Sequence, residues 1–268
     1  MNEALHQAWA EGRPTVNAWL ALGNAFAAEI VAAQGFDSVT VDMQHGILDY
    51  IDLVPMLQAM RSSGAGLLVR VPWLDPAEVM RVLDAGADGV ICPMINSAAE
   101  AARFVSYTRY VPDGVRSFGP TRAAITHGAD YAARANARRI AFAMIETAEG
   151  LADLEAIVAT PGLSGIYVGP ADLALSLSQG RLAGAGDREE PEMIAALQRI
   201  AAACRRQGII AALHCGTADY AARAVGWGYQ MTTVGGDTRF LAEGAAKSVR
   251  DFRKLTGNPG QAGPIRPR

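Results

Sequence analysis

Short apolar runs of strand length recur at near-regular intervals along this chain, and alanine-rich segments with helical spacing separate them. A continuous apolar run is typical of a strand that is covered on both faces, as in a parallel sheet. The repeated strand-then-helix order predicts an α/β fold, a closed (β/α)₈ barrel, with an additional helix at about residues 2–11. The eight expected strands are Val16–Leu20, Ser38–Met43, Leu67–Val71, Gly89–Met94, Ile140–Ile145, Gly165–Val168, Ile209–His214 and Gln230–Val234.

The segments between these runs carry the start and stop signals of helices. Asp75-Pro76 offers an N-cap followed by proline at the first helical position, and Gly86 suits the left-handed turn that ends the same helix. A doubly wound open sheet is the alternative fold. It would normally carry a glycine-rich phosphate turn, and neither GxGxxG nor GxxxxGK[ST] occurs in the sequence. We expect one barrel domain over residues 1–256 and a flexible tail over residues 257–268.

Composition narrows the classes of partner. Charged residues make up 19% of the 268 residues and the net charge is −3, so nothing indicates a nucleic-acid or anionic-membrane partner. The densest basic cluster, Arg134, Arg138 and Arg139, is interpreted as a solvated surface. No run approaches the ~20 apolar residues of a membrane span, and the first ten residues do not resemble a signal peptide. We therefore expect a cytoplasmic protein with small-molecule partners.

The cysteines argue against a structural zinc site. Cys92, Cys204 and Cys215 are odd in number and have no CxxC spacing. Cys92 and Cys215 lie inside or beside apolar runs, so we expect reduced and buried thiols.

Polar side chains stand where several of the expected strands end. In a parallel barrel these ends meet at one mouth, which is where enzymes of this fold keep their catalytic residues. A single such residue is easily explained as a hydrogen-bonded core group, but several at one mouth favour a functional site. The residues concerned are Asp42, Gln44, His45, Arg70, Glu146, Asp172, His214 and Asp237.

Glu146 and Asp172 are the candidate metal ligands. They follow the fifth and sixth expected strands, so their carboxylates should converge at the mouth. Two hard oxygen ligands suit a divalent cation of the Mg²⁺ or Mn²⁺ kind. The alternative interpretation is that each acid caps the helix that follows it, since acids favour helix N-termini.

His45 and Arg70 are candidates for acid–base and oxyanion chemistry. An imidazole titrates near neutral pH, and a guanidinium matches the geometry of a carboxylate or oxyanion. The alternatives are a core histidine bonded to Asp42, and an arginine that only neutralises Asp42 or Glu146. Asp84 lies inside an expected helix and taken alone is an ordinary surface acid. His214 fits a structural and a supporting role equally well.

These residues resemble the HpcH/HpaI family of class II pyruvate aldolases, whose barrels are of the phosphoenolpyruvate/pyruvate type. The resemblance spans about residues 14 to 250, and the order and spacing of its motifs identify the chain as a member. The motifs are Asp42-Met-Gln-His-Gly46, Arg70-Val-Pro72, Leu83-Asp-Ala-Gly86, Cys92-Pro-Met94, Met144-Ile-Glu-Thr147 and Gly165-Ile-Tyr-Val-Gly-Pro-Ala-Asp-Leu173.

The resemblance implies a metal-bound 2-oxo acid, pyruvate or hydroxypyruvate. Glu146 and Asp172 are expected to bind Mg²⁺, Mn²⁺ or Co²⁺, and the substrate chelates the metal through its carboxylate and keto oxygens. Main-chain amides around Gly169, Ala171 and Asp172 are expected to hold the carboxylate at a helix N-terminus, an arrangement that is also expected on physical grounds.

The resemblance also gives roles to the remaining candidates. Arg70 would stabilise the keto or enolate oxygen. His45, held by Asp42 or by Asp84 of a neighbouring barrel, would move the proton of the 4-hydroxyl group. The aldehyde side of the pocket would be shaped by Trp19 and Leu213.

The reaction implied is cleavage or formation of a 4-hydroxy-2-oxo acid, with an aldehyde as the second partner. No lysine stands at an expected strand end, which disfavours a Schiff-base aldolase. The alternatives are a lyase of the malyl- or citramalyl-CoA type and a catalytically silent 2-oxo-acid-binding protein. The resemblance further implies a homo-oligomer, a hexamer built as a trimer of dimers that exchange the last helix.

Two departures from the family pattern bear on the substrate. Met144 stands where many relatives carry glutamine, and residues 116–122 are less glycine-rich than usual. This segment lies in one of two long connections, residues 112–138 and 178–190, and connections of such length commonly form lids or oligomer contacts. The aldehyde, the preferred metal and the stereochemistry at C4 are left open by the sequence.

Overall fold

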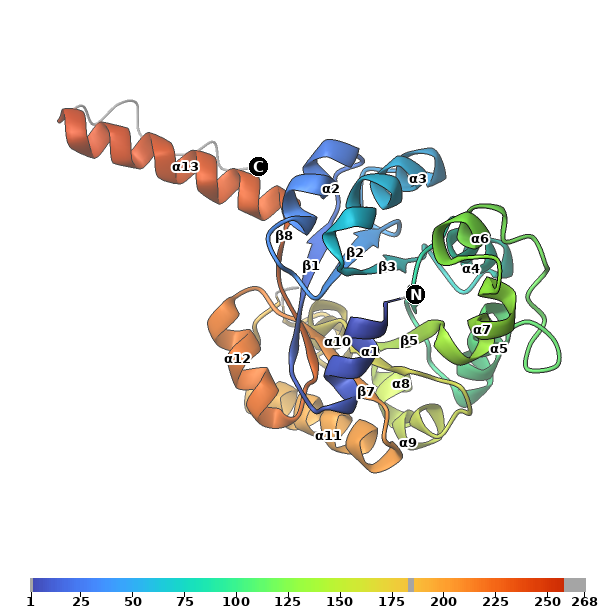
Figure 1. Ribbon diagram of the computed structural model, residues 1–268. Helices are drawn as coiled ribbons and strands as arrows, with labels where there is room; N and C mark the ends of the chain where they lie inside the picture. The colour runs from blue at the N-terminus through green and yellow to red at the C-terminus, as the bar shows by residue number, and fades with distance from the viewer. Residues whose placement is uncertain (1, 183–185, 258–268) are drawn as a thin grey trace.

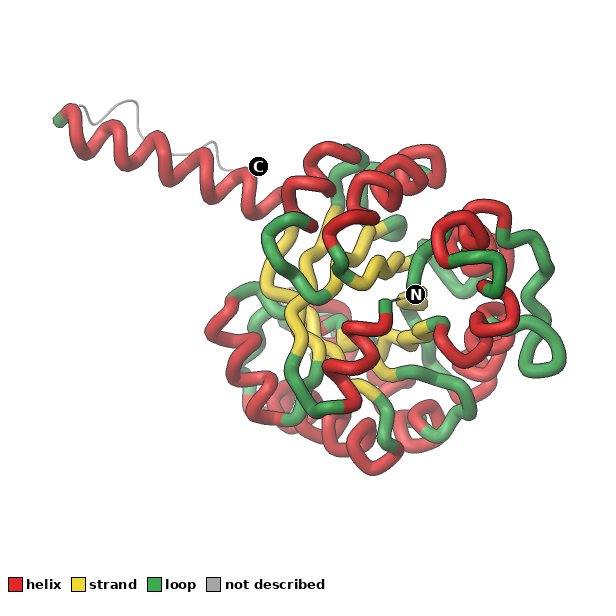
Figure 2. The backbone as a smooth tube through the Cα atoms, viewed as in Figure 1, coloured by secondary structure: helices red, strands yellow, loops and turns green. Residues whose placement is uncertain are grey.

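The computed structural model describes residues 2–182 and 186–257, and its centre is a closed barrel of parallel strands. Each strand pairs with the next in the sequence, and β8 pairs with β1. Figure 2 shows the ring of strands with helices around it. The strands are β1 Thr15–Leu20, β2 Ser38–Asp42, β3 Gly66–Arg70, β4 Gly89–Cys92, β5 Ile140–Ile145, β6 Gly165–Val168, β7 Ile210–His214 and β8 Met231–Gly236.

Helices cover the outside of the barrel and one of its ends (Figure 1). A 3₁₀ turn, η1 Met60–Ser63, follows α3. The helices are α1 Glu3–Ala10, α2 Ala25–Ala32, α3 Tyr50–Ala59, α4 Pro76–Asp84, α5 Ala98–Thr108, α6 Thr121–His127, α7 Tyr131–Arg138, α8 Ala148–Ala152, α9 Leu154–Val158, α10 Pro170–Leu177, α11 Pro191–Gln207, α12 Ala218–Trp227 and α13 Asp237–Thr256.

The predicted barrel and its additional N-terminal helix are confirmed. The cap signals also act as expected: Asp75 accepts a hydrogen bond from the Ala77 amide at 2.7 Å, and Gly86 adopts a φ of +98°. The long connection 112–138 is not a simple loop, because it contains α6 and α7. From residue 258 on, the predicted tail lies outside the described residues.

The strands bury side chains on both faces, which divides the core into two parts. The larger part lies between the strands and the surrounding helices. The smaller part fills the inside of the barrel, where Leu5 and Trp9 of α1 join strand residues such as Phe142. The rings of Trp9 and Phe142 meet edge-on at 5.9 Å, and Trp9 donates a hydrogen bond to Thr15 at 2.9 Å. Helix α1 therefore closes one end of the barrel.

The interpretation of Arg139 as a surface residue was wrong. Its side chain is only 1% exposed, lies 5.1 Å from the Tyr131 ring centroid and donates to the Ala87 carbonyl. A planar guanidinium can be buried in this way because it stacks on aromatic rings while it donates hydrogen bonds. The cysteine prediction is confirmed, since Cys92, Cys204 and Cys215 are free and buried. Within the described ranges, no helix has the length and apolar character needed to cross a membrane.

Candidate active site

A pocket of about 410 Å³ lies at the mouth formed by the carboxyl ends of the strands. It brings together candidates from six strands, or from the segments that directly follow them, that are far apart in the sequence. It also includes Gly186, which belongs to the long connection 178–190. The lining residues are Trp19, His45, Arg70, Met144, Glu146, Gly169, Pro170, Ala171, Asp172, Gly186, His214 and Gly216.

Only one of the two carboxylate oxygens of Glu146 accepts a hydrogen bond from the described residues. It directly follows β5 and is 2% exposed. Its Oε1 accepts a hydrogen bond from the Met94 amide at 2.7 Å, and no hydrogen bond to Oε2 occurs within the described residues. Burial raises the pKa of Glu146 to about 7, although the Met94 amide lowers it, and the negative charge of Asp172 raises it further. A cation bound nearby would favour the charged carboxylate and so lower the pKa of Glu146 again.

Glu146 is not a helix cap. Thr147 caps α8 by accepting from the Gly150 amide at 2.9 Å, while Met94 orients the glutamate. Met94 adopts a φ of +54°, a left-handed conformation that is uncommon for a residue with a side chain. Such conformations cost of order 1–3 kcal/mol and persist where the surroundings impose them, often at functional sites.

Asp172 lies in the first turn of α10, directly above Gly169, the N-cap residue of that helix. Gly169 contributes no side chain, and Asp172 makes no capping hydrogen bond in the described structure. The carboxylate is exposed and lines the pocket with Glu146. Two carboxylates beside the amino end of a helix form a donor set that fits a hard divalent cation and an anionic ligand together.

Arg70, Asp42 and Trp19 form one buried unit. Arg70 donates from Nε to Asp42 Oδ1 at 2.8 Å and from Nη2 to Oδ2 at 2.6 Å. The Trp19 indole donates to the same Oδ2 at 3.1 Å, and the Arg70 guanidinium lies 4.9 Å from the Trp19 ring centroid. Burial alone would raise the pKa of Asp42, but its bonds to Arg70 and Trp19 outweigh this and lower the pKa. Asp42 therefore fixes Arg70 in the pocket wall as a permanent cation.

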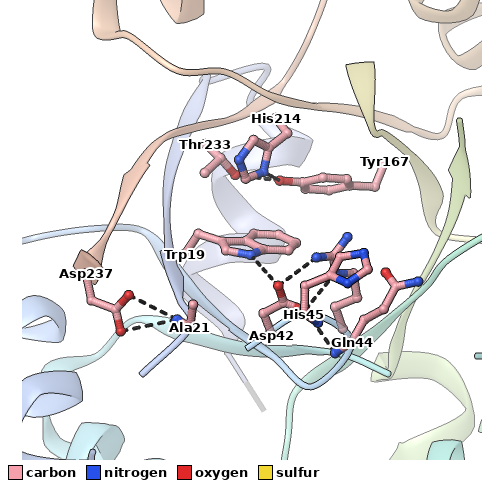
Figure 3. Close-up of polar contacts among 10 residues, drawn as sticks. Trp19, Ala21, Asp42, Gln44, His45, Tyr167, His214, Thr233 and Asp237 are labelled. Atoms are coloured by element: carbon pink, nitrogen blue, oxygen red, sulfur yellow. Dashed lines mark hydrogen bonds and ion pairs between the residues drawn. The ribbon is translucent and has the colours of Figure 1, made fainter. Parts of the chain in front are cut away.

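His45 is not a core histidine. Its side chain is exposed at the pocket, and Asp42 holds it through the main chain, because the His45 amide donates to Asp42 Oδ1 at 3.3 Å. Figure 3 shows His45 beside Asp42 and Trp19 at the mouth. An exposed imidazole at the rim is available for proton transfer with a bound molecule.

Comparison with known proteins agrees with this geometry. The model of the HpcH/HpaI aldolase/citrate lyase family matches residues 16–243. The chain belongs to the HpcH/HpaI aldolase/citrate lyase family. A hydroxypyruvate/pyruvate aldolase of Rhizorhabdus wittichii is 37% identical over 247 residues, which cover 92% of this chain and 97% of that protein.

Other relatives of the HpcH/HpaI family give the same result. A 4-hydroxy-2-oxo-heptane-1,7-dioate aldolase of Salmonella typhi is 32% identical over 97% of this chain and 99% of its own length. A crystal structure of an HpcH/HpaI aldolase/citrate lyase family protein from Burkholderia cenocepacia superposes with a TM-score of 0.86 at 32% identity, covering 94% of this chain and all of that one. The chain is thus a class II pyruvate aldolase, in a family known for divalent-metal dependence.

Two residues assigned from the HpcH/HpaI resemblance lie outside the pocket of this chain. Asp84, at the end of α4, pairs with the buried Arg116 at 2.6 Å, and burial raises its pKa although Arg116 opposes the shift. Leu213 is fully buried in the outer core, because side chains alternate along β7. The next residue, His214, faces the pocket instead.

Some pocket groups of this HpcH/HpaI aldolase were not predicted as site residues. The Met94 amide acts through the backbone, so no residue type marks it in the sequence. Met144, noted in the sequence only as a departure from the family pattern, lines the pocket. Tyr167, which contacts the pocket residue His214, was counted only as a strand residue. Both side chains belong to the core inside the barrel, a position that strand alternation predicts for residues of their parity. Asp237, listed among the strand-end acids, has a structural role: it accepts from the amides of Ala21 and Leu22.

Gly169 is expected to be essential for this aldolase. An added Cβ would lie 2.4 Å from Glu146 Oε2, so the free carboxylate oxygen would have to move. We expect Gly169→Ala to lower aldol turnover by roughly 10²-fold, as misplacement by about an ångström can. The matched control is Gly226→Ala in α12, where nothing lies within 4 Å of the new Cβ. It should keep full turnover and gain about 0.5–1 kcal/mol of stability. Full turnover of Gly169→Ala would contradict the assignment.

Proposed function

We propose that this aldolase cleaves and forms 4-hydroxy-2-oxo acids with a divalent metal ion, pyruvate or hydroxypyruvate as the oxo acid, and an aldehyde as the second substrate. The observation that carries the proposal is the pair Glu146 and Asp172, which line one pocket next to the cation Arg70. The names of the relatives in Rhizorhabdus wittichii and Salmonella typhi support the substrate class.

Glu146 and Asp172 would hold Mg²⁺, Mn²⁺ or Co²⁺, which when bound supplies positive charge beside the carboxylate and keto oxygens of the oxo acid. Two carboxylates leave most of an octahedral shell open to substrate and water. Among the described residues, no cluster of three or more histidine, cysteine and acidic side chains is positioned to enclose an ion. This open arrangement is typical of a catalytic site rather than a structural one.

The amino end of α10 would bind the carboxylate of the oxo acid. The helix begins at Pro170, so the amides of Ala171 and Asp172 have no partners in the preceding turn. Gly169 leaves room for close approach, and both Gly169 and Ala171 line the pocket. The partial positive charge of the helix end adds to the binding of an anion.

Arg70 would stabilise the negative charge that develops on the keto oxygen when the C3–C4 bond breaks. Its two bonds to Asp42 fix its orientation before the reaction, so little reorganisation is needed. His45 would take the proton of the 4-hydroxyl group during cleavage and return it during synthesis. Trp19 would bound the aldehyde side with its indole ring.

Removal of the metal should stop the reaction. We expect protein with Mn²⁺, pyruvate and a simple aldehyde to form aldol product, and EDTA to abolish product formation because the charge beside the keto oxygen is lost. Excess Mn²⁺ should restore the rate. Chromatographic quantification of the aldol product measures both steps, and turnover that is insensitive to EDTA would contradict the proposal.

We also propose that the chain forms a homo-oligomer, a hexamer built as a trimer of dimers that are joined through α13. In Figure 1 this helix extends away from the barrel. It exposes an apolar stripe that includes Leu241 at 67%, Phe252 at 65% and Leu255 at 86%. Exposed stripes of this kind usually mark protein contacts. Light scattering should give the mass of six chains for the wild type. Leu255→Glu should reduce the mass of the assembly, whereas the control Lys254→Glu, on the polar face of α13, should not. A monomeric wild type would refute this part.

A further inference from the structure

A chain of hydrogen bonds runs through the inside of the barrel toward the pocket. It starts at Asn17 of β1, which is fully buried. Asn17 Oδ1 accepts from the hydroxyls of Ser38 at 2.8 Å and Thr40 at 3.0 Å. Its amide nitrogen therefore points the other way and donates to Thr233 Oγ1 of β8 at 2.9 Å. Three neighbouring strands thus supply the partners of one amide.

The chain continues from Thr233 to the pocket wall. Tyr167 of β6 is fully buried, and its hydroxyl lies 2.7 Å from Thr233 Oγ1 and 3.1 Å from His214 Nδ1. Figure 3 shows these three side chains together, on the opposite side of Trp19 from Asp42. His214 ends the chain at the pocket, which it lines.

We assign one consistent direction to these bonds. Asn17 donates to Thr233 Oγ1, the Thr233 hydrogen goes to the Tyr167 oxygen, and the Tyr167 hydrogen goes to His214 Nδ1, which is then an acceptor. Because hydroxyls both donate and accept, this direction is part of the proposal, and the tautomer of His214 tests it. A neutral imidazole with an acceptor at Nδ1 carries its hydrogen on Nε2. Burial lowers the pKa of His214 to about 4, and the charge of Arg70 lowers it further, so the ring is neutral at pH 7.

The Nε2–H group of His214 has no partner of its own. No hydrogen bond to it is formed by the residues of the described ranges, and His214 itself lines the pocket. The ring stands edge-on to Trp19, with centroids 4.9 Å apart at 87°. Glu146 and Asp172 occupy the ends of β5 and β6, whereas His214 and Trp19 come from β7 and β1. The donor thus lies on the side of the pocket left for the aldehyde.

We propose that His214 determines specificity: its Nε2–H donates to a hydroxyl group of the aldehyde, so the enzyme prefers hydroxylated aldehydes to their deoxy counterparts. A neutral donor suits a hydroxyl better than a carboxylate. An aldehyde without the hydroxyl leaves Nε2–H unpaired, and sites built on a hydrogen bond discriminate strongly against such analogues. The substrate preference rests on the proposed aldolase function, but the tautomer does not.

The tautomer can be tested without turnover. The chain has four histidines, so ¹⁵N long-range correlation spectra of labelled protein are simple, and the His214 signals are those missing in His214→Leu. We expect the pattern of a neutral ring with hydrogen on Nε2 at pH 7. In Tyr167→Phe the pattern should shift toward a mixture of tautomers. A ring with hydrogen on Nδ1, or an imidazolium, would overturn the proposal.

The preference is tested with glycolaldehyde and acetaldehyde, which differ by one hydroxyl. In Mn²⁺-loaded wild type, kcat/KM should favour glycolaldehyde, and His214→Leu should reduce the ratio by roughly 10- to 100-fold. Tyr167→Phe should reduce it less. Tyr229→Phe is the matched control, since this buried tyrosine donates to Leu197 in the outer core, and its ratio should equal that of wild type.

The outcomes separate this inference from the proposed function. Exchange of the pyruvate methyl protons in D₂O reports the oxo-acid site alone. If wild type exchanges them but His214→Leu keeps the wild-type aldehyde ratio, the specificity role is refuted and the aldolase stands. If wild type shows no exchange, the proposed function fails, and with it the substrate preference.

Discussion

Replacement of Glu146 by glutamine should reduce aldol turnover by roughly three orders of magnitude or more. The change keeps the size of the side chain but removes one of the two proposed charged metal ligands, and with the metal the charge that would stabilise the developing oxyanion. The fold should survive, because a neutral amide costs less to bury than the 2%-exposed carboxylate. Calorimetry with Mn²⁺ should detect no binding at micromolar concentrations, and Asp172→Asn should behave alike.

The control for this variant is Glu149→Gln. Glu149 is an exposed glutamate in the first turn of α8, three residues away. It should retain Mn²⁺ binding and turnover, because its charge is solvated. Wild-type metal affinity in Glu146→Gln, with an unchanged melting temperature, would exclude this residue as a ligand and remove the basis of the proposed function.

Replacement of Arg70 by methionine should damage both stability and catalysis. Asp42 is 3% exposed and would be left buried without its cation. Loss of one member of a buried ion pair costs about 3–5 kcal/mol, which denaturant unfolding at pH 7 would measure. Turnover should fall by roughly 10²- to 10³-fold, because the proposed fixed donor to the keto oxygen is lost.

A second variant separates the two effects of Arg70. In Asp42→Asn/Arg70→Met the buried charge is gone, so most of the stability should return while turnover stays low. Arg81→Met is the surface control: Arg81 pairs with Glu78 at 3.2 Å on the outside of α4, and such pairs contribute at most about 1 kcal/mol. Recovery of turnover in the double variant would mean that Arg70 has only a structural role.

The strands could be predicted from the sequence because their signal is local. A strand buried on both faces must be apolar throughout, and β5 and β6 end at the residues where their apolar runs end. Elsewhere, as at β8, the boundary moved by one or two residues, since glycines and threonines can extend a barrel strand without an apolar signal. The helices α6 and α7 were missed because both are short and bury only one or two residues each, so they lack a wide apolar face.

The site was predictable where a charged residue interrupts an apolar context, as at Glu146 and Arg70. The burial of Arg139 was not, because it depends on Tyr131, which α7 brings to it. The outward position of Leu213 could have been predicted from strand alternation alone. His214 ends the same strand and faces the pocket, so its neighbour Leu213 faces the outer core. The hydrogen bonds of the Tyr167 hydroxyl could not be predicted either, because its partners His214 and Thr233 come from other strands, β7 and β8.

Helix α1 blocks the far end of the barrel with Leu5 and Trp9, so both reactants must pass through the same mouth. In the proposed function the oxo acid would bind at depth against the buried Glu146, and the aldehyde would lie above it, toward the exposed His45. An aldehyde that arrives first obstructs the route to the metal ligands. Steady-state kinetics in the synthetic direction should therefore follow a compulsory order, with the oxo acid first, and excess aldehyde should inhibit competitively against it.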